Sequence, residues 1–365
     1  MVKKTKVIAT IGPSSCEDKT LRSLIGAGVD LFRFNLKHNT IDWHNRTIHR
    51  LSEIADDMNK NIGIIVDVPN PKYKLEINKC DFVAISFADS GRLVDNFRKR
   101  LPKHLMNVRL ISKIESQKAL DSLQELIKAA DGVMIARGDL GLSIPLEQIT
   151  YWQKTIINAC REESRPVIVA TQMLQSMTQF PKPTRAEATD VANAVFDGAD
   201  ALMLSEESAI GKYPVKAAEE MIRIAKFCES KNEMLLEVKK DHKNSTEVLV
   251  EAAVGIIKNR ADFPIRGVLV FTQSGNTART LSSYRVNIPV IAVSNDSQVV
   301  ETLNLSYGVI PFCRHFKNSQ FSLSNPVLKE MATAVGLRQS DNVLVIHGNN
   351  WLSKGSTSNI SLIQL

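Results

Sequence analysis

Short apolar segments recur along the first 205 residues, and each is followed by a polar or amphipathic stretch. Each segment is apolar at consecutive positions, as expected for a parallel strand that is buried on both faces. Helical periodicity lies between most of them and is clearest at 117–130 and 146–163. The pattern favours a closed TIM-type (β/α)8 barrel over an open doubly wound sheet. The eight predicted strands are 6–12, 31–36, 62–68, 81–88, 108–115, 132–137, 166–172 and 199–205.

A second α/β pattern begins after residue 230. Residues 245–260 are predicted to form a helix, and 267–272, 289–293, 309–311 and 343–347 are predicted strands. The polar stretch 229–233 is the expected boundary. We therefore expect a barrel domain at 1–230 and a smaller C-terminal α/β domain at 231–365.

Charge and composition exclude several classes of protein. The chain has 46 basic and 39 acidic side chains, a net charge of +7, but the basic residues are scattered and aromatics are only 6%. This disfavours nucleic-acid binding, which needs a concentrated basic patch, and is compatible with small phosphorylated substrates. There is no apolar run of about 18 residues and no secretion signal, so we expect a cytoplasmic protein without membrane contact. Five cysteines without a CxxC pair predict neither a disulfide framework nor structural zinc.

Reactive side chains gather at the ends of the predicted barrel strands, where barrel enzymes build their sites. Glu115 and Asp139 end neighbouring strands and suit a hard cation such as Mg²⁺ or Mn²⁺. Arg33 and Lys113 offer positive charge for a phosphate or an enolate oxygen. Thr171 adds a hydroxyl at the same rim. Lys113 and Glu115 alternate, so both are expected to face the barrel interior.

Backbone donors complete this predicted site. Gly138 and Asp139 stand in a small-residue turn at the end of the sixth strand. Their free N–H groups would form a cradle for a substrate carboxylate.

These residues resemble the motifs of the pyruvate kinase family. The match extends over most of the chain, and the motifs are specific. They lie at 113–115, 134–141, 170–174, 176–177, 183–187, 190–195, 197–200 and 211–214.

The resemblance implies an eight-stranded barrel followed by a regulatory C-terminal domain. It implies that Lys113 neutralises the transferring phosphoryl group, and that Glu115 and Asp139 bind Mg²⁺ or Mn²⁺. Thr171 would lie near the carbon that receives the proton, and Arg33 would contact phosphate. The backbone of Gly138 and Asp139 would hold the substrate carboxylate. Family members are commonly homotetramers, so a homo-oligomer is expected.

One departure from the family concerns a whole domain. Family members carry a lid domain of about a hundred residues after the third barrel strand, together with a barrel helix. In this sequence, only residues 69–80 separate the third and fourth strands. By its length alone, either the link is stretched or a helix of the outer ring is missing; the resemblance implies that the lid and the helix are both absent. A lid closes on the nucleotide and excludes water, so its loss would weaken nucleotide binding.

A second departure concerns the monovalent-cation site. The family has Ser where Lys37 stands, Thr where Val68 stands and often Glu where Lys72 stands, while Asn35 and Asp67 are kept. A lysine ammonium near Asp67 could replace K⁺ charge for charge. We therefore expect no requirement for K⁺.

The resemblance also marks the nucleotide side of the site. His38 matches a position beside the nucleotide. Lys74 replaces a family Arg, which keeps the charge but loses the bidentate fork. Glu206 replaces a family Gly at the end of the eighth strand and adds a carboxylate to the rim.

A Ser/Thr/Gly loop in the second domain follows a strand and opens a helix. Such loops bind phosphate, and this one resembles the sugar-phosphate effector loop of the family, as 348–359 resembles its second effector loop. A capped helix without ligand is the equally weighted alternative. The predicted effector residues are Thr272, Ser274, Gly275, Asn276 and Thr277.

Three functions remain open at this point. The first is phosphoryl transfer between phosphoenolpyruvate, or a close analogue, and a nucleotide such as ADP or ATP. The second is a metal-dependent lyase (an aldolase or decarboxylase) that acts on a 2-oxo acid through the same enolate without nucleotide. The third is a non-catalytic regulatory protein. The physiological substrate, its pathway and the oligomeric state do not follow from the sequence.

Overall fold

The computed structural model describes residues 3–231, 240–241, 244–258, 263–314, 326–349, 355 and 357–365. The chain divides into two compact units. The barrel unit is Thr5–Leu236, and the C-terminal unit is Glu237–Leu365 together with Met1–Lys4.

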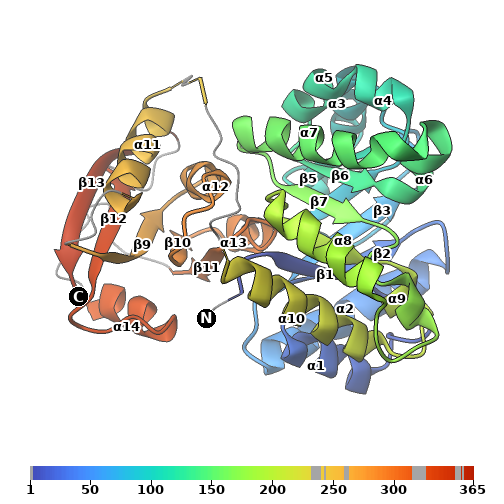
Figure 1. Cartoon of the computed structure of the whole chain (residues 1–365), viewed down its shortest axis with the longest axis horizontal. Helices are drawn as coiled ribbons and strands as arrows, with labels where there is room; N and C mark the ends of the chain where they lie inside the picture. The colour runs from blue at the N-terminus through green and yellow to red at the C-terminus, as the bar shows by residue number, and fades with distance from the viewer. Residues whose placement is uncertain are drawn as a thin grey trace. The chain divides into compact units, whose positions relative to one another are not determined.

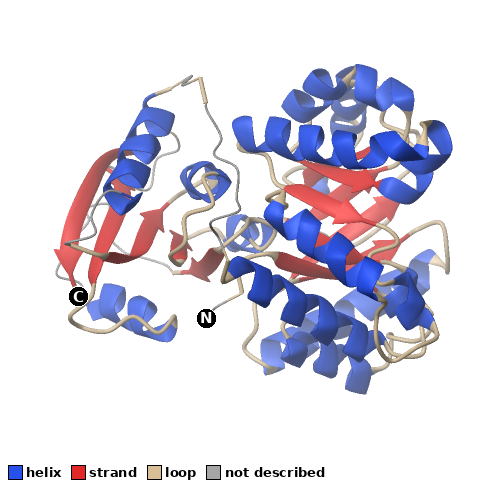
Figure 2. Cartoon of the chain, in the orientation of Figure 1, coloured by secondary structure: helices blue, strands red, loops and turns tan. Residues whose placement is uncertain are grey.

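Eight parallel strands close into a barrel in chain order, so the predicted TIM-type fold is confirmed (Figures 1 and 2). Each strand lies within a predicted segment and is shorter than it, because the segment ends belong to the loops that carry the site. The strands are β1 (Lys6–Thr10), β2 (Leu31–Asn35), β3 (Gly63–Val68), β4 (Phe82–Ile85), β5 (Arg109–Ile114), β6 (Gly132–Ala136), β7 (Val167–Ala170) and β8 (Ala201–Leu204).

Helices surround the barrel strands (Figure 2). The predicted helix 117–130 is in fact two helices that meet at Ser122, whose backbone leaves the helical region. The helices are α1 (Asp18–Ala27), α2 (Ile41–Asp57), α3 (Gly91–Lys99), α4 (Gln117–Asp121), α5 (Leu123–Ala129), α6 (Arg137–Ser143), α7 (Ile149–Glu162), α8 (Arg185–Phe196), α9 (Glu206–Ala209) and α10 (Pro214–Glu229), with short 3₁₀ turns η1 (Lys103–Leu105), η2 (Leu146–Gln148) and η3 (Gln175–Thr178).

Side chains alternate between the two faces of each barrel strand. In β2, Phe32 and Phe34 pack into the apolar core that separates the barrel strands from the helices. The side chain of Arg33, the residue between them in the sequence, is not part of that core. The same holds for Asp67 in β3 and Lys113 in β5, which are buried but lie outside that core. The alternation therefore places three charged groups inside the barrel.

No helix joins β3 to β4. The two strands pair directly in parallel, and every residue of the link from 69 to 81 is described without helix or strand. The outer helix of this βα unit is therefore missing, which was one of the two alternatives raised by the sequence.

The C-terminal unit contains a five-stranded sheet in the order β11-β10-β9-β12-β13. Strand β13 pairs antiparallel with β12 and was not predicted from sequence, because it is rich in polar residues and its first three residues fall in the segment interpreted as an effector loop. The strands are β9 (Ile265–Phe271), β10 (Val290–Ser294), β11 (Val309–Cys313), β12 (Asn342–Gly348) and β13 (Thr357–Gln364), and the helices are α11 (Ser245–Lys258), α12 (Asn276–Ser283), α13 (Ser297–Leu303) and α14 (Pro326–Ala334).

Both faces of this sheet are covered. Val268 and Val270 of β9 pack in one cluster with side chains of α11, α12 and α13. Leu269 and Phe271 of the same strand pack in another cluster with Met331 of α14. This period-two division explains the continuous apolar run in β9.

Candidate active site

Four charged side chains meet inside the barrel at the carboxyl ends of β2, β3 and β5. The Arg33 Nε and Nη2 atoms donate to Asp67 Oδ2 at 2.9 and 2.6 Å. The Lys113 Nζ lies 3.3 Å from Asp67 and 2.7 Å from Glu115 Oε1. All four side chains are at most 9% exposed. The sequence prediction that Lys113 and Glu115 face the interior is confirmed.

The four side chains form two cationic and two anionic groups in a nearly dry environment. Burial opposes ionisation of Asp67, but Arg33 and Lys113 together hold the pKa of its carboxyl below the usual range. Burial raises the pKa of Glu115, although the Lys113 ammonium opposes that shift. The cluster therefore has no excess charge, and an incoming phosphate must compete with these carboxylates for the two cations.

Ser86 and Phe87 follow β4 and complete the cluster, and sequence reasoning missed both. Lys113 Nζ donates to Ser86 Oγ at 2.7 Å, and Ser86 Oγ lies 3.3 Å from Asp67 Oδ1. The Phe87 N–H donates to Glu115 Oε2 at 2.8 Å. The strand-end rule could have identified them, since they stand at the end of a predicted strand.

Thr171 lies at the end of β7 and is held in a strained conformation. Its φ is 68°, which is unfavourable for a β-branched residue, and Gln172 follows at 54°. The Thr171 hydroxyl accepts a hydrogen bond from the Gly138 N–H at 2.7 Å. One donor of the predicted carboxylate cradle is therefore already engaged by the residue assigned to proton delivery.

Arg137 fixes this strained turn. Its Nη2 atom donates to the Thr171 carbonyl at 2.9 Å and lies 2.6 Å from an Asp190 oxygen of α8. The guanidinium is 9% exposed. The sequence placed Arg137 at a strand end, within the motif at 134–141, but assigned it no role, because the motif does not show that the guanidinium contacts a backbone carbonyl.

Two carboxylates remain as candidate metal ligands. Glu115 ends β5, and Asp139 lies in α6 directly after β6, the strand that pairs with β5. Asp139 is exposed, and its carboxylate has no hydrogen bond or ion pair within the described part of the chain. No group of three or more His, Cys, Asp and Glu side chains among the described residues can hold a metal. Oxygen ligands of this kind fit Mg²⁺ or Mn²⁺, with substrate and water completing the coordination.

Of the residues expected at the monovalent-cation site, Asn35 lies opposite Asp67 in the β2–β3 register, whereas Lys37 and Lys72 do not pair with Asp67. Lys37 and Lys72 are exposed, and neither forms an ion pair with Asp67. Asn35 Oδ1 accepts from the Lys37 N–H at 3.2 Å in a local turn. The expectation that one of these lysines lies beside Asp67 is wrong, because Arg33 and Lys113 already occupy its carboxylate.

The predicted nucleotide residues lie on the surface. His38 is exposed, and its carbonyl oxygen is 2.7 Å from the His44 ring. The Lys74 ammonium pairs with Glu76 at 2.9 Å, and its side chain is 87% exposed. Glu206 accepts from Gln175 at 2.7 Å. These side chains do not touch the buried cluster.

The predicted effector loop forms a hydrogen-bonded turn in the C-terminal unit. Thr272 Oγ1 accepts from the Gly275 N–H at 3.0 Å, and Ser274 Oγ accepts from the Asn276 N–H at 3.4 Å. Gly275 has a φ of 75°, and Thr277 Oγ1 lies 2.8 Å from Thr357 Oγ1. The loop lines a cavity of about 180 Å³. Most of the second predicted effector segment, 350–354 and 356, lies outside the described residues.

Comparison with known proteins gives the family. A model described as "Pyruvate kinase, barrel domain" matches residues 2–79 and 71–218, and one described as "Pyruvate kinase, alpha/beta domain" matches 247–363. The chain belongs to the pyruvate kinase family. The buried cluster and the strained Thr171 turn lie in the part of the chain that the barrel model matches.

Several pyruvate kinases are similar in sequence to this chain. The pyruvate kinase of Clostridium perfringens is 39% identical over 77% of this chain and 60% of its own length, and that of Clostridium acetobutylicum is 38% identical over 84% and 66%. The chain therefore spans less than two thirds of these two relatives. The pyruvate kinase of Thermococcus litoralis is 28% identical over 99% of this chain and 98% of its own length.

Proposed function

We propose that this chain transfers a phosphoryl group between phosphoenolpyruvate and a nucleoside diphosphate. The observation that carries the proposal is the buried cluster of Arg33, Lys113, Asp67 and Glu115 at the strand ends. Two cations in a nearly dry interior are matched to a phosphate and to the charge that develops during its transfer. An oxygen of the diphosphate attacks phosphorus, the bond from phosphorus to the enol oxygen breaks, and the enolate carbon then takes a proton.

Lys113 and Arg33 have distinct parts in this proposal. Arg33 would contact the substrate phosphate through the N–H groups that Asp67 and Thr10 do not take, because its Nε and Nη2 atoms already donate to Asp67. Lys113 lies between Asp67 and Glu115, so its ammonium can turn to the transferring phosphoryl group while it stays solvated by one of them. Ser86, directly after β4, accepts a hydrogen bond from Lys113 and so supports it.

Glu115 and Asp139 would hold Mg²⁺ or Mn²⁺, which supplies charge neutralisation at the substrate carboxylate and enolate oxygens. Gly138 and Asp139 would bind the substrate carboxylate through their N–H groups, and the Gly138 N–H would leave the Thr171 hydroxyl to do so. Thr171 would then deliver the proton from its released hydroxyl. Activity would not require K⁺, since the Asp67 carboxylate is already paired with two cations.

The nucleotide would bind at an open rim that includes His38 and Lys74. We propose that a lid domain is absent between β3 and β4, in keeping with their direct pairing and the short link. Without a lid the nucleotide KM is expected to be high.

No helix among the described residues is long and apolar enough to cross a membrane, and we propose a cytoplasmic location.

A homo-oligomer and a sugar-phosphate effector extend the proposal. Leu142, Leu146 and Tyr151 are 89%, 78% and 64% exposed along one segment of the barrel unit, as expected of side chains that a second copy covers. The cavity of about 180 Å³ at Thr272–Thr277 suits a single phosphate group.

The test is pyruvate formation from phosphoenolpyruvate with Mg²⁺, measured with and without ADP. Pyruvate that appears only with ADP supports phosphoryl transfer. Pyruvate formed at the same rate without ADP would indicate transfer of the phosphoryl group to water, and turnover of oxaloacetate or an aldol without nucleotide would indicate a lyase; either result overturns the proposal. Metal-independent binding of ligand without any turnover would point to a regulatory protein.

A further inference from the structure

A cavity of about 740 Å³ opens in the C-terminal unit at the amino ends of its parallel strands. Arg266 lies in β9, Pro289 precedes β10, Gly308 precedes β11 and Arg338 precedes β12. The effector loop follows the carboxyl end of β9, so the cavity is at the opposite end of the same sheet. Its volume is within the usual range for small-molecule sites.

The lining of this cavity is strongly basic. Lys3, Lys4, Arg266 and Arg338 contribute four cationic side chains, and Asp341 is the single acidic residue that lines it. The Asp341 carboxylate accepts from the Arg338 backbone N–H at 2.7 Å. The lining therefore carries a net charge of about +3, which attracts anions.

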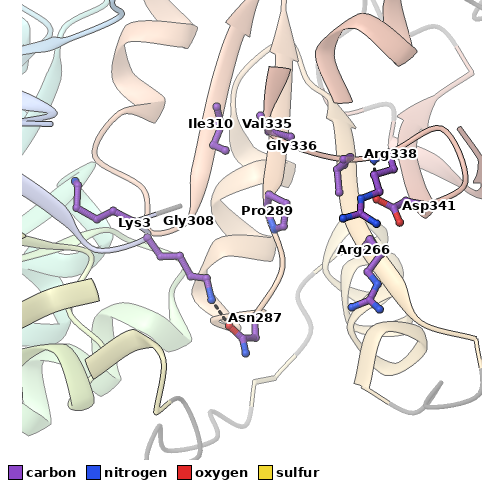
Figure 3. A pocket seen from close by; sticks show the side chains of 12 residues that line it. Lys3, Arg266, Asn287, Pro289, Gly308, Ile310, Val335, Gly336, Arg338 and Asp341 are labelled. Atoms are coloured by element: carbon purple, nitrogen blue, oxygen red, sulfur yellow. Dashed lines mark hydrogen bonds between the residues drawn. The ribbon is translucent and has the colours of Figure 1, made fainter. Parts of the chain in front are cut away.

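The two guanidinium groups are available to a ligand. Within the described ranges, neither Arg266 nor Arg338 has a side-chain hydrogen bond or ion pair, and both side chains are exposed. Figure 3 draws them on one flank of the cavity, with Lys3 and Asn287 on the other. Lys4 is 6% exposed, and its ammonium donates to Asn287 Oδ1. An anion that binds between these two sides would meet the guanidinium groups of both arginines, whose paired N–H donors match the geometry of a phosphate.

The wall between the flanks is apolar. Pro289, Ile310, Val335 and Leu337 line it. Gly336 leaves more room, because a Cβ atom built there meets no atom within 4 Å. An inorganic ion would use only a small part of such a volume and none of the apolar surface. An organic body attached to the phosphate would bury that surface.

We propose that this cavity is a binding site for a small organic phosphate, which pairs its phosphate with Arg266 and Arg338 and lays its body on the apolar wall. This proposal concerns the C-terminal unit and does not depend on the reaction proposed for the barrel. Its readout is therefore binding and not catalysis.

The experiment follows the Ile310 methyl resonance of the full chain by NMR, assigned through the Ile310→Val variant. The probes are AMP, inorganic phosphate and citrate. AMP is expected to shift the Ile310 signal, and to bind at least about fivefold more tightly than inorganic phosphate because of the apolar wall. A local signal also separates this cavity from binding at Thr272–Thr277.

The double variant Arg266→Gln with Arg338→Gln removes both forks from exposed positions, so the fold is expected to persist, with an unchanged melting temperature as the check. Its affinity for AMP is expected to fall at least about tenfold. The matched control, Lys329→Gln, removes one exposed charge of α14 outside the cavity and is expected to leave affinity unchanged. No Ile310 shift at millimolar AMP, equal affinity in the double variant, or citrate or inorganic phosphate binding as tightly as AMP would each overturn the proposal.

Discussion

The Nε and Nη2 atoms of Arg33 both donate a hydrogen bond to the same oxygen of Asp67, at 2.9 and 2.6 Å, and both side chains are almost fully buried. The other Asp67 oxygen faces Lys113. One carboxylate thus orders both cations of the proposed phosphate site before any substrate binds.

Asp67→Asn should therefore destabilise the fold and disable the site. The change leaves two buried cations without their shared counter-charge, and breaking a buried pair in this way costs about 3–5 kcal/mol. Urea denaturation measures the loss of unfolding free energy. Asp56→Asn, at an exposed position of α2, is the control and should change stability by less than about 0.5 kcal/mol. An equally small effect of Asp67→Asn would show that the pair does not organise the site.

Thr171→Val should abolish proton delivery while Thr171→Ser retains it. Valine keeps the β-branched shape without the hydroxyl that the Gly138 N–H holds. The measurement is deuterium entry into the methyl group of pyruvate with Mg²⁺, expected to fall by about 10²–10⁴ in the valine variant. The serine variant should stay within about tenfold of the unchanged protein. Equal exchange by all three proteins would assign proton delivery elsewhere.

Arg137→Gln should lower kcat more than it raises KM. The variant loses the Asp190 ion pair and the clamp on the Thr171 carbonyl, and misplacement of a catalytic group by about 1 Å can cost up to about 10²-fold. Arg137→Lys should recover part of the loss. Arg185→Gln, an exposed change at the start of α8, is the matched control. A pure KM effect would indicate that Arg137 acts on substrate binding.

Much of this site could be anticipated from the sequence, because barrel strands have a simple pattern and their ends carry the site. Lys113 and Glu115 were found by alternation, which geometry enforces. Ser86 and Arg137 act through hydrogen bonds to other protein groups, and nothing in the local sequence marks those partners. Lys37 was expected beside Asp67 because the sequence does not show that Arg33 packs against Asp67 in the folded barrel. Strand β13 was missed because its edge position leaves half its residues polar.

Asp131→Asn should lower the free energy of unfolding at neutral pH but have little effect on it at acidic pH. Burial disfavours the charge of Asp131, but Arg98 and Arg109, each at 3.0 Å, hold its pKa below the ordinary 3.8. A lowered pKa gives stability that is complete above the unfolded value and is lost as pH falls through the folded value. The difference in unfolding free energy from the unchanged protein, about 1–3 kcal/mol at pH 7, should shrink below about pH 3.8. Asp95→Asn, at an exposed position of α3, is the control, and a difference independent of pH would refute the charge pairing.

Replacing K⁺ by tetramethylammonium should leave the rate of pyruvate formation unchanged. The Asp67 carboxylate, which the family pairs with a monovalent cation, is here already neutralised by Arg33 and Lys113. The measurement is the initial rate at matched ionic strength. Strict dependence on K⁺ would contradict this prediction without affecting the phosphoryl-transfer proposal.

The most direct test of the central claim is phosphorus-31 NMR of phosphoenolpyruvate and ADP with Mg²⁺. We expect the γ-phosphate signal of ATP to grow with the unchanged protein and with Lys118→Gln, whose side chain is 74% exposed. With Lys113→Gln, checked for folding by its melting temperature, transfer should be at least about 10²-fold slower. No ATP signal from the unchanged protein, or equal transfer by Lys113→Gln, would contradict the account.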